Sequence, residues 1–270
     1  MIALGEFLTQ ATAQLEASNI GSARLDVLIL LEDQLVKERS WILAHPEVML
    51  SSPQLKRLNK LIGRRAQHEP LAYIRGFSEF YGRRFKVNKH VLEPRPESET
   101  MIDLLKKLKL PSSPKIADVG TGSGCLGITA ALEIHPSVVD LYDIDSGALA
   151  VARHNEHMHE LKLEVHKRDL LNRPVRPSYD IILANLPYVP NSWNINEAAK
   201  AEPRIAIFGG KDGLDVYRRL FQQLEAYSWK SKYILTESLP PQQIGLEKIA
   251  KAHGFKQLKS KDFIQVFTAS

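Results

Sequence analysis

The sequence contains a single cysteine, Cys125, and no apolar run long enough to cross a bilayer. One cysteine excludes an intrachain disulfide and argues against a cysteine-based metal site. It lies just inside a predicted helix, and we interpret it as a small packing residue rather than a nucleophile. The first ten residues, MIALGEFLTQ, lack a basic start and a long apolar core. We therefore expect no signal peptide, no membrane contact and a cytoplasmic location.

The chain also lacks a strong excess of one charge. The net charge of +5 is compatible with an acidic or nucleic-acid-containing partner but does not identify one. Its 270 residues, 44% of them hydrophobic, can bury one large core or two smaller ones. Four histidines crowd between residues 154 and 166, but no carboxylates complete a site, so we expect no metal.

Residues 1–75 have the apolar spacing of a small helical domain. Ser22 is expected to cap the second helix, and Pro53 to be the first residue of the third. The third helix carries five basic residues: Lys56, Arg57, Lys60, Arg64 and Arg65. Such a run is either a solvated face or a docking surface for an anionic partner.

Residues 76–94 are expected to form a β-hairpin around Gly82 followed by a linker. The VLEPRPESE segment contains two prolines, which predicts a stiff, extended connection. A helix should then begin at Pro96 or Ser98 and continue to about residue 109. Trp193 and Trp229 are expected to pack loops or the edge of a sheet.

Strands and helices alternate in the remainder of the chain. Strands are predicted near residues 115–119, 138–142, 163–167, 179–184, 231–237, 255–259 and 262–268, and helices near 124–134, 146–158, 213–227 and 241–253. This alternation predicts an α/β fold with a largely parallel sheet covered on both faces. Because no helix separates the last two strands, they should form an antiparallel hairpin at one edge.

Polar residues and glycines follow the first three of these strands. After the first strand, Gly120-Thr121-Gly122-Ser123-Gly124 removes side chains where a ligand must touch the backbone. After the second, Asp143 can accept hydrogen bonds from ribose hydroxyls, whereas Asp145 is expected to cap the next helix. After the third, Asp169 can accept a hydrogen bond from an adenine amino group, with Leu170 packed on the ring.

The fourth strand ends in Asn185-Leu186-Pro187-Tyr188. Asn185 offers an acceptor oxygen, Pro187 restricts the backbone around Leu186, and Tyr188 offers a flat face. Together they suit a planar –NH2 group. Because the carboxyl ends of parallel strands meet at one edge of a sheet, we expect all four strand ends to line a single crevice.

These features resemble those of class I S-adenosylmethionine-dependent methyltransferases. More closely, the chain resembles the protein-(glutamine-N5) methyltransferases of peptide-chain release factors. The resemblance is carried by the VLEPRPESE linker, the DVGTGSG loop, the NLPY motif, and Glu202-Pro203-Arg204 with the GGKDGL segment that follows. It extends nearly from end to end, and the linker and GGKDGL segment are its most specific parts.

The resemblance implies a Rossmann-like, seven-stranded, mostly parallel sheet with an antiparallel edge strand at 95–270. A helical substrate-recognition domain (1–75) and the hairpin linker (76–94) would precede it. The implied reaction moves a methyl group from S-adenosyl-L-methionine to the glutamine of a Gly-Gly-Gln motif in a release factor, leaving S-adenosyl-L-homocysteine. We expect a monomer that acts in translation termination and requires no nucleic acid.

The resemblance also implies roles for individual residues. Residues 120–124 would wrap the methionine part of the cofactor, Asp143 would hold the ribose, and Leu170 beside Asp169 would contact the adenine. Asn185, which also borders the cofactor, and the Leu186 carbonyl would accept the two amide hydrogens of the glutamine. Tyr188 would pack on the amide plane, next to Pro187.

The chain departs from the family pattern in several places. Leu186 replaces a proline, Ser98 a threonine, and Thr236-Glu237-Ser238-Leu239 a more glycine-rich segment. The Asn-Leu-Pro-Tyr motif is similar to that of rRNA adenine-N6 dimethyltransferases, so a nucleic-acid methyltransferase is the main alternative. A non-enzymatic binding protein that keeps the fold is a weaker one, since the glycines, Asp143, Asn185 and Tyr188 are all present.

Overall fold

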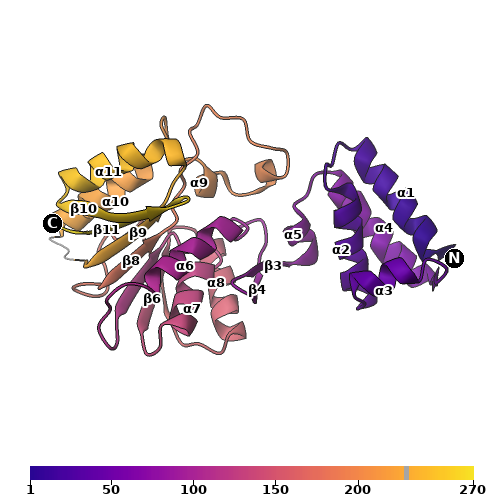
Figure 1. The fold of residues 1–270 in the computed structure, drawn as a ribbon, viewed down its shortest axis with the longest axis horizontal. Coiled ribbons are helices and arrows are strands. Elements are labelled where there is room, and N and C mark those ends of the chain that lie inside the picture. Colours follow the sequence, from indigo (N-terminus) through magenta and orange to yellow (C-terminus); the bar gives the residue numbers. More distant parts are fainter. Residues whose placement is uncertain (228–230) are drawn as a thin grey trace. The chain divides into compact units, whose positions relative to one another are not determined.

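The computed structural model describes residues 1–227 and 231–270, which form two compact units (Figure 1). The first unit contains residues 1–76 and 196–201, and the second contains residues 77–195 and 202–270. Trp229 lies outside the described residues. Trp193 is 53% exposed, so the expectation that it packs a loop or a sheet edge was wrong.

The first unit is helical. Its elements are β1 (Ile2–Ala3), α1 (Leu4–Ala17), α2 (Ala23–Leu35), α3 (Arg39–Ala44), β2 (Met49–Leu50), α4 (Ser52–Ala66), α5 (Leu71–Arg75) and the 3-10 turn η2 (Ala199–Ala201). Ser51 caps α4 in a capping box with Gln54, which makes Pro53 the second residue of the helix rather than the first. Ser22 precedes α2, but its side chain makes no capping hydrogen bond. Ser22 therefore occupies the predicted N-cap position without making the side-chain hydrogen bond of a cap.

The five basic residues of α4 fall into two groups, those in ion pairs and those exposed to solvent. Arg65 is buried and donates from Nε to Asp26 Oδ2 on α2 at 2.6 Å. Arg64 pairs with Glu69 at 2.5 Å. The buried Arg65–Asp26 pair holds α2 and α4 together, because either charge alone would be costly to bury. Three of the five basic residues, Lys56, Arg57 and Lys60, are exposed.

The second unit begins with the predicted hairpin, formed by β3 (Phe77–Phe80) and β4 (Arg83–Lys86). Phe80 and Phe85 bury their rings against the core of this unit. The linker then leads into the 3-10 turn η1 (Pro96–Ser98) and α6 (Glu99–Leu105). The helix therefore ends about one turn earlier than expected.

The remaining elements form the predicted seven-stranded sheet and its helices. They are β5 (Lys115–Val119), α7 (Cys125–Glu133), β6 (Val138–Asp143), α8 (Ser146–Met158), β7 (Glu164–Lys167), β8 (Ile181–Ala184), α9 (Arg204–Ile207), α10 (Asp215–Ala226), β9 (Tyr233–Glu237), η3 (Pro240–Gln242), α11 (Gln243–Ala252), β10 (Phe255–Lys261) and β11 (Ile264–Ala269). The strand order is β10-β11-β9-β8-β5-β6-β7. Strands β5 to β9 pair in parallel, and the predicted antiparallel hairpin of β10 and β11 lies at one edge.

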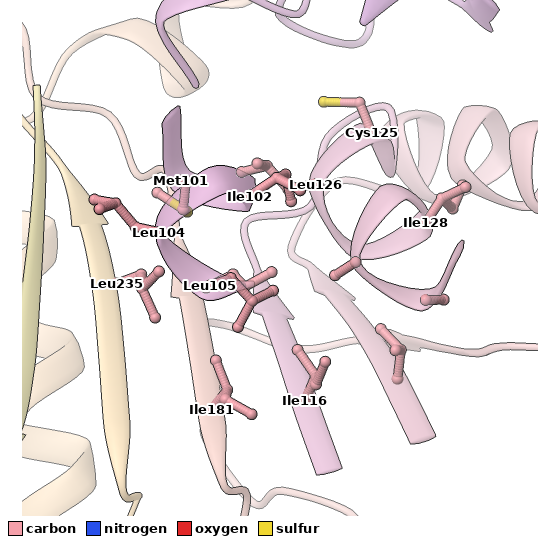
Figure 2. Close-up of a cluster of buried hydrophobic side chains, with 14 of the residues drawn as sticks. Met101, Ile102, Leu104, Leu105, Ile116, Cys125, Leu126, Ile128, Ile181 and Leu235 are labelled. Atoms are coloured by element: carbon pink, nitrogen blue, oxygen red, sulfur yellow. The ribbon is translucent and has the colours of Figure 1, made fainter. Parts of the chain in front are cut away.

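Both faces of this sheet are covered, as the alternation predicted (Figure 1). Side chains such as Ile116 and Ile181 lie on the face covered by α6, near Leu105, and belong to the same buried cluster as Leu126 of α7 (Figure 2). Their neighbours along the strands point to the opposite face and pack against α10 and α11. This alternation is the two-residue period of a strand, and it buries both faces of the sheet.

The strand order reverses between β5 and β8. From β5 the chain adds β6 and β7 on one side, and then returns to place β8 on the other. Ligands of open α/β sheets bind at the carboxyl ends of the strands at such a point. Among the residues the structure describes, none of the helices combines the length and apolar composition needed to cross a membrane.

Candidate active site

A cavity opens at this switch point, and its walls come from the loops after β5, β6, β7 and β8. The predicted site residues that line it are Gly120, Thr121, Gly122, Ser123, Asp143, Asp169, Leu170, Asn185, Leu186 and Pro187. Of the predicted residues, all of which the structure describes, Gly124 and Tyr188 do not line it. The four strand ends that we expected to share a crevice therefore do line a single cavity.

The glycine loop connects the two sides of this cavity. Gly120 has a φ of +70°, and a Cβ there would lie 2.9 Å from Leu186 Cδ2. The absence of a side chain thus lets the loop after β5 pack directly on the motif after β8. Gly124 forms the N-cap of α7, where a Cβ would meet Ile128 on α7 and Ala152 on α8. Its role in this structure is to let helices pack closely.

Asp143 holds the glycine loop as well as facing the cavity. Its Oδ2 accepts from Gly122 N at 2.9 Å, and its Oδ1 accepts from Asp145 N at 2.9 Å. Burial raises the pKa of this carboxyl, and the two N–H groups counteract the rise. Asp145 caps α8 by accepting from Ala148 N, as predicted.

Asp118 lies beneath the loop, with its side chain fully buried. Its Oδ2 accepts from Thr121 Oγ1 at 2.6 Å and from Gly127 N at 2.8 Å. Burial raises the pKa of Asp118 from 3.8 to about 6. Nearby, burial raises the pKa of the Cys125 thiol to about 12, which supports its interpretation as a packing residue.

The end of β7 contributes an acid and an apolar side chain. Asp169 is half-exposed and forms an ion pair with Arg219 of α10. Leu170 is 8% exposed, lines the cavity and adopts a φ of +55°, which an apolar side chain rarely does. Asp169 and Leu170 both line the cavity.

The Asn185 amide is fixed by two residues that the sequence analysis did not assign to the site. Asn185 Nδ2 donates to Ser98 Oγ at 2.9 Å and to Glu237 Oε2 at 3.0 Å. Both amide hydrogens are thereby used inside the protein, so the oxygen remains for a ligand. The sequence analysis named Ser98 as a possible helix start, and it named both Ser98 and Glu237 as departures from a family pattern. Nothing local links them to residue 185.

The Tyr188 side chain is oriented by the same carboxylate, that of Glu237. Its hydroxyl donates to Glu237 Oε1 at 3.0 Å, and burial raises its pKa. Leu186 is anchored through its N–H, which donates to the Tyr217 hydroxyl at 3.2 Å. The Tyr217 hydroxyl also contacts the carbonyls of Ala184 and Glu237, and so joins the ends of β8 and β9.

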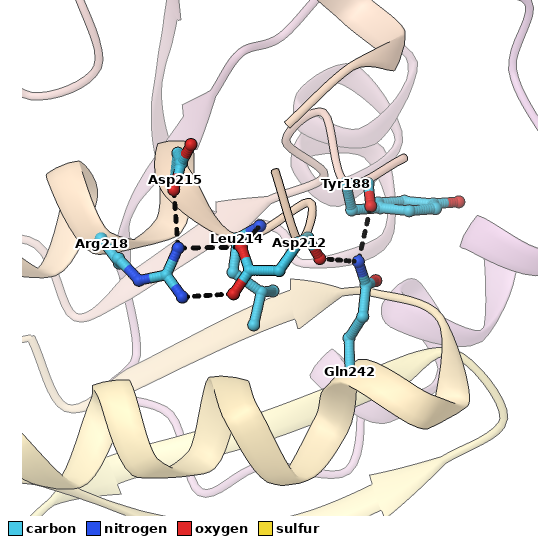
Figure 3. A network of polar contacts seen from close by, with 6 residues as sticks. All are labelled: Tyr188, Asp212, Leu214, Asp215, Arg218 and Gln242. Atoms are coloured by element: carbon cyan, nitrogen blue, oxygen red, sulfur yellow. Dashed lines mark hydrogen bonds and ion pairs between the residues drawn. The ribbon is translucent and has the colours of Figure 1, made fainter. Parts of the chain in front are cut away.

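The GGKDGL segment contacts the Asn-Leu-Pro-Tyr motif at the Tyr188 carbonyl, and Gln242 links the two (Figure 3). Gln242 Nε2 donates to the Tyr188 carbonyl at 2.7 Å and to the Asp212 carbonyl at 2.8 Å. Gly213 has a φ of +82°, and a Cβ there would lie 2.0 Å from the Tyr188 carbonyl oxygen. Arg218 pairs with Asp212 and holds the pKa of that carboxyl near 2. The segment therefore fixes the backbone at Tyr188 by direct contact.

The linker forms part of the cavity wall. Residues 90–95 line it, and Arg95 pairs with Glu202 at 2.5 Å. Glu202 Oε1 also accepts from Glu93 N at 3.0 Å. The Glu202-Pro203-Arg204 segment thus ties the linker down, with the Glu202 side chain only 2% exposed. Sequence reasoning found both segments but could not pair them across 107 residues.

The fold and the site together define a class I methyltransferase. Residues 98–201 match the family model of the methyltransferase small domain. The fold is similar to that of a methyltransferase from Pyrococcus furiosus, with a TM-score of 0.51 and 14% identity over 80% of this chain and 97% of that one. At this level of identity, the likeness shows the fold alone.

The sequence relatives are more specific. Residues 6–76 match the model of the PrmC N-terminal domain. A release factor glutamine methyltransferase of Coxiella burnetii is 33% identical over 88% of this chain and 87% of its own. One from Koribacter versatilis is 36% identical over 82% of this chain and 81% of its own. The chain therefore belongs to the family of release factor glutamine methyltransferases.

Proposed function

We propose that this protein transfers a methyl group from S-adenosyl-L-methionine to the side-chain nitrogen of the glutamine in a release factor's Gly-Gly-Gln motif. The observation that carries the proposal is the fixed Asn185 amide. Its hydrogens are held by Ser98 and Glu237, which leaves its oxygen as the acceptor. An acceptor at that place suits a substrate –NH2 group, and the relatives named above carry the matching activity in their names.

The residues of the cavity fit the cofactor. The loop from Gly120 to Ser123 exposes backbone rather than large side chains, and Asp143 is the acid at the end of β6. Leu170 offers an apolar surface at the far wall, next to Asp169. When bound, S-adenosyl-L-methionine supplies an activated methyl group on a sulfonium. Residues 120–123 would hold its methionine part, Asp143 its ribose, and Asp169 with Leu170 its adenine.

The acceptor side would orient a poor nucleophile. An amide nitrogen reacts weakly because its lone pair is delocalised over the carbonyl. Asn185 Oδ1 and the Leu186 carbonyl would accept its two hydrogens, which increases electron density on the nitrogen and fixes its direction. Tyr188 would border the amide plane. Correct positioning alone is worth up to roughly 7–11 kcal/mol of the barrier, so no strong base is needed before transfer, and the extra proton leaves afterwards.

We assign substrate recognition to the helical unit of residues 1–75, with 76–94 as the hairpin linker and 95–270 as the methyltransferase domain. The exposed Lys56, Arg57 and Lys60 would then face an anionic part of the partner. We expect the protein to act as a cytoplasmic monomer without nucleic acid. The product of the cofactor would be S-adenosyl-L-homocysteine.

The test is methyl labelling. The protein is incubated with methyl-labelled S-adenosylmethionine and either a release factor, the same factor with its Gly-Gly-Gln glutamine changed to alanine, or ribosomal RNA. We expect label on the intact factor only. Label on RNA alone would refute the proposal and favour the adenine-N6 alternative raised by the Asn-Leu-Pro-Tyr motif.

A variant separates the acceptor role of Asn185 from cofactor binding. Asn185→Ala should keep the cofactor dissociation constant within about threefold but lower transfer by roughly 10²–10³, the loss typical of removing one fixed polar contact to the reacting group. Cofactor binding is measured by calorimetry, and transfer by single-turnover labelling. Loss of cofactor binding as the main defect would contradict the acceptor role.

A further inference from the structure

Glu237 is a buried carboxylate at the end of β9 for which the proposed transfer has no direct use. It is 1% exposed. Among the described residues, no basic side chain lies within ion-pair distance of it. Burial without a counter-charge is costly, and it raises the pKa of this carboxyl. A protein retains such a group where its hydrogen bonds do something that an apolar side chain cannot.

Three donors converge on this carboxylate, one from the start of α6 and two from the Asn-Leu-Pro-Tyr motif. Ser98 Oγ donates to Oε2 at 2.6 Å, Asn185 Nδ2 to Oε2 at 3.0 Å, and the Tyr188 hydroxyl to Oε1 at 3.0 Å. Ser98 also accepts the second hydrogen of Asn185, at 2.9 Å. Ser98, Asn185 and Glu237 thus form a closed triangle, and each of its bonds has a definite direction.

The direction of these bonds decides which end of the Asn185 amide faces the cavity. A carboxylate accepts hydrogens and donates none, so it attracts the –NH2 end of the amide. An Asn side chain without such a partner has two nearly isosteric orientations, and in one of them –NH2 would face a substrate –NH2. Two donors facing each other form no hydrogen bond, so only the observed orientation leaves an acceptor for the substrate.

We propose that Glu237 is a positioning residue that, together with Ser98, holds the Asn185 oxygen toward the acceptor nitrogen. The inference rests on the proposed function for its consequence in catalysis but not for the hydrogen bonds themselves. Glu237 also sets the Tyr188 ring through the hydroxyl. One carboxylate therefore orients both polar side chains of the Asn-Leu-Pro-Tyr motif.

Two substitutions at Glu237 separate positioning from packing and from charge. Glu237→Leu keeps the volume but removes both acceptors. Glu237→Gln keeps an oxygen for Asn185 and Ser98, and its –NH2 meets the Tyr188 hydroxyl, which can accept instead of donate. We expect the leucine variant to lower kcat at least tenfold with a cofactor dissociation constant within about threefold of wild type. The glutamine variant should retain kcat within about fivefold.

The orientation of the amide is read independently by NMR. The side-chain –NH2 signals of Asn185 are assigned by their loss in Asn185→Asp. Their hydrogen exchange should be slow in wild type and in Glu237→Gln, and at least tenfold faster in Glu237→Leu. Because this readout needs no substrate, it stands even if labelling shows that the release factor is not the acceptor. Failure of the proposed function and failure of the inference are thereby distinguished.

Three results would overturn the inference. They are full kcat in a folded Glu237→Leu, loss of kcat in a folded Glu237→Gln that binds cofactor, and unchanged exchange at Asn185 in the leucine variant. The second result would mean that the negative charge itself is required. If the leucine variant does not fold, Ser98→Ala carries the test, because it removes one side of the triangle. It should lower kcat about two- to tenfold and speed exchange at Asn185, and no change in either would refute positioning.

Discussion

Asp118 provides a quantitative test of how the glycine loop is built. Its carboxyl is fully buried, and its pKa rises from 3.8 to about 6. Between these two values the folded chain keeps a proton that the unfolded chain has released. The free energy of unfolding therefore falls as pH rises through this range. The rise of the Asp118 pKa from 3.8 to about 6 corresponds to a loss of about 3 kcal/mol in the free energy of unfolding.

Asp118→Asn removes the charge but keeps the geometry. Thr121 Oγ1 and Gly127 N both donate to the same oxygen, Oδ2, so one amide oxygen can accept both bonds. The variant should resemble wild type near pH 4, where the wild-type carboxyl is protonated in the folded chain. At pH 7.5 the variant should be more stable, by up to about 3 kcal/mol.

Urea unfolding of both proteins, without cofactor, at pH 4.5, 5.5, 6.5 and 7.5 measures this difference. The other carboxyl groups are common to both proteins, so their contributions largely cancel in the difference between the two unfolding free energies. Asp262→Asn, at a side chain that is 57% exposed, controls for the loss of one carboxylate and should change stability by less than about 0.5 kcal/mol. A difference between wild type and Asp118→Asn that is constant with pH would refute the reasoning.

Two further predictions concern the support behind Tyr188. Gly213→Ala should lower the free energy of unfolding by about 1–3 kcal/mol, because φ is +82° and the new Cβ would lie 2.0 Å from the Tyr188 carbonyl oxygen. Thermal unfolding beside Gly63→Ala, where nothing lies within 4 Å, tests this, and equal destabilisation of both would contradict it. Gln242→Leu leaves the carbonyls of Tyr188 and Asp212 without their donor and should lower stability by about 1–3 kcal/mol. Urea midpoints measure it, and an unchanged midpoint would show that other donors replace Gln242.

The architecture was predictable because its signals are local. Apolar runs such as 115–119 and 138–142 mark buried strands, and glycines and acids at their ends mark the crevice. Alternation with helices then requires a parallel sheet, which brings those ends to one edge. Element boundaries were less accurate. The α-helix after the linker ends at Leu105 because the next N–H groups, those of Lys107 and Leu108, bond to carbonyls three residues back instead of four.

The support of the site was not predictable in the same way. Asn185 takes its orientation from partners 87 and 52 residues distant, and no spacing in the sequence encodes such a pair. Glu237 lies in an apolar strand, where a single acid is indistinguishable from a surface charge. The predicted roles of the cofactor-binding and acceptor residues remain predictions.

The partners of Asn185 also have a consequence for the order in which the protein matures. Chains emerge from the ribosome starting at the N-terminus, and domains fold as they become available. A nascent chain that has emerged as far as α10 already contains the glycine loop, Asp143 and Asn185, but neither Glu237 nor Gln242. The hydrogen bonds that Glu237 and Gln242 make to Asn185 and Tyr188 therefore form only after β9 and η3 have emerged.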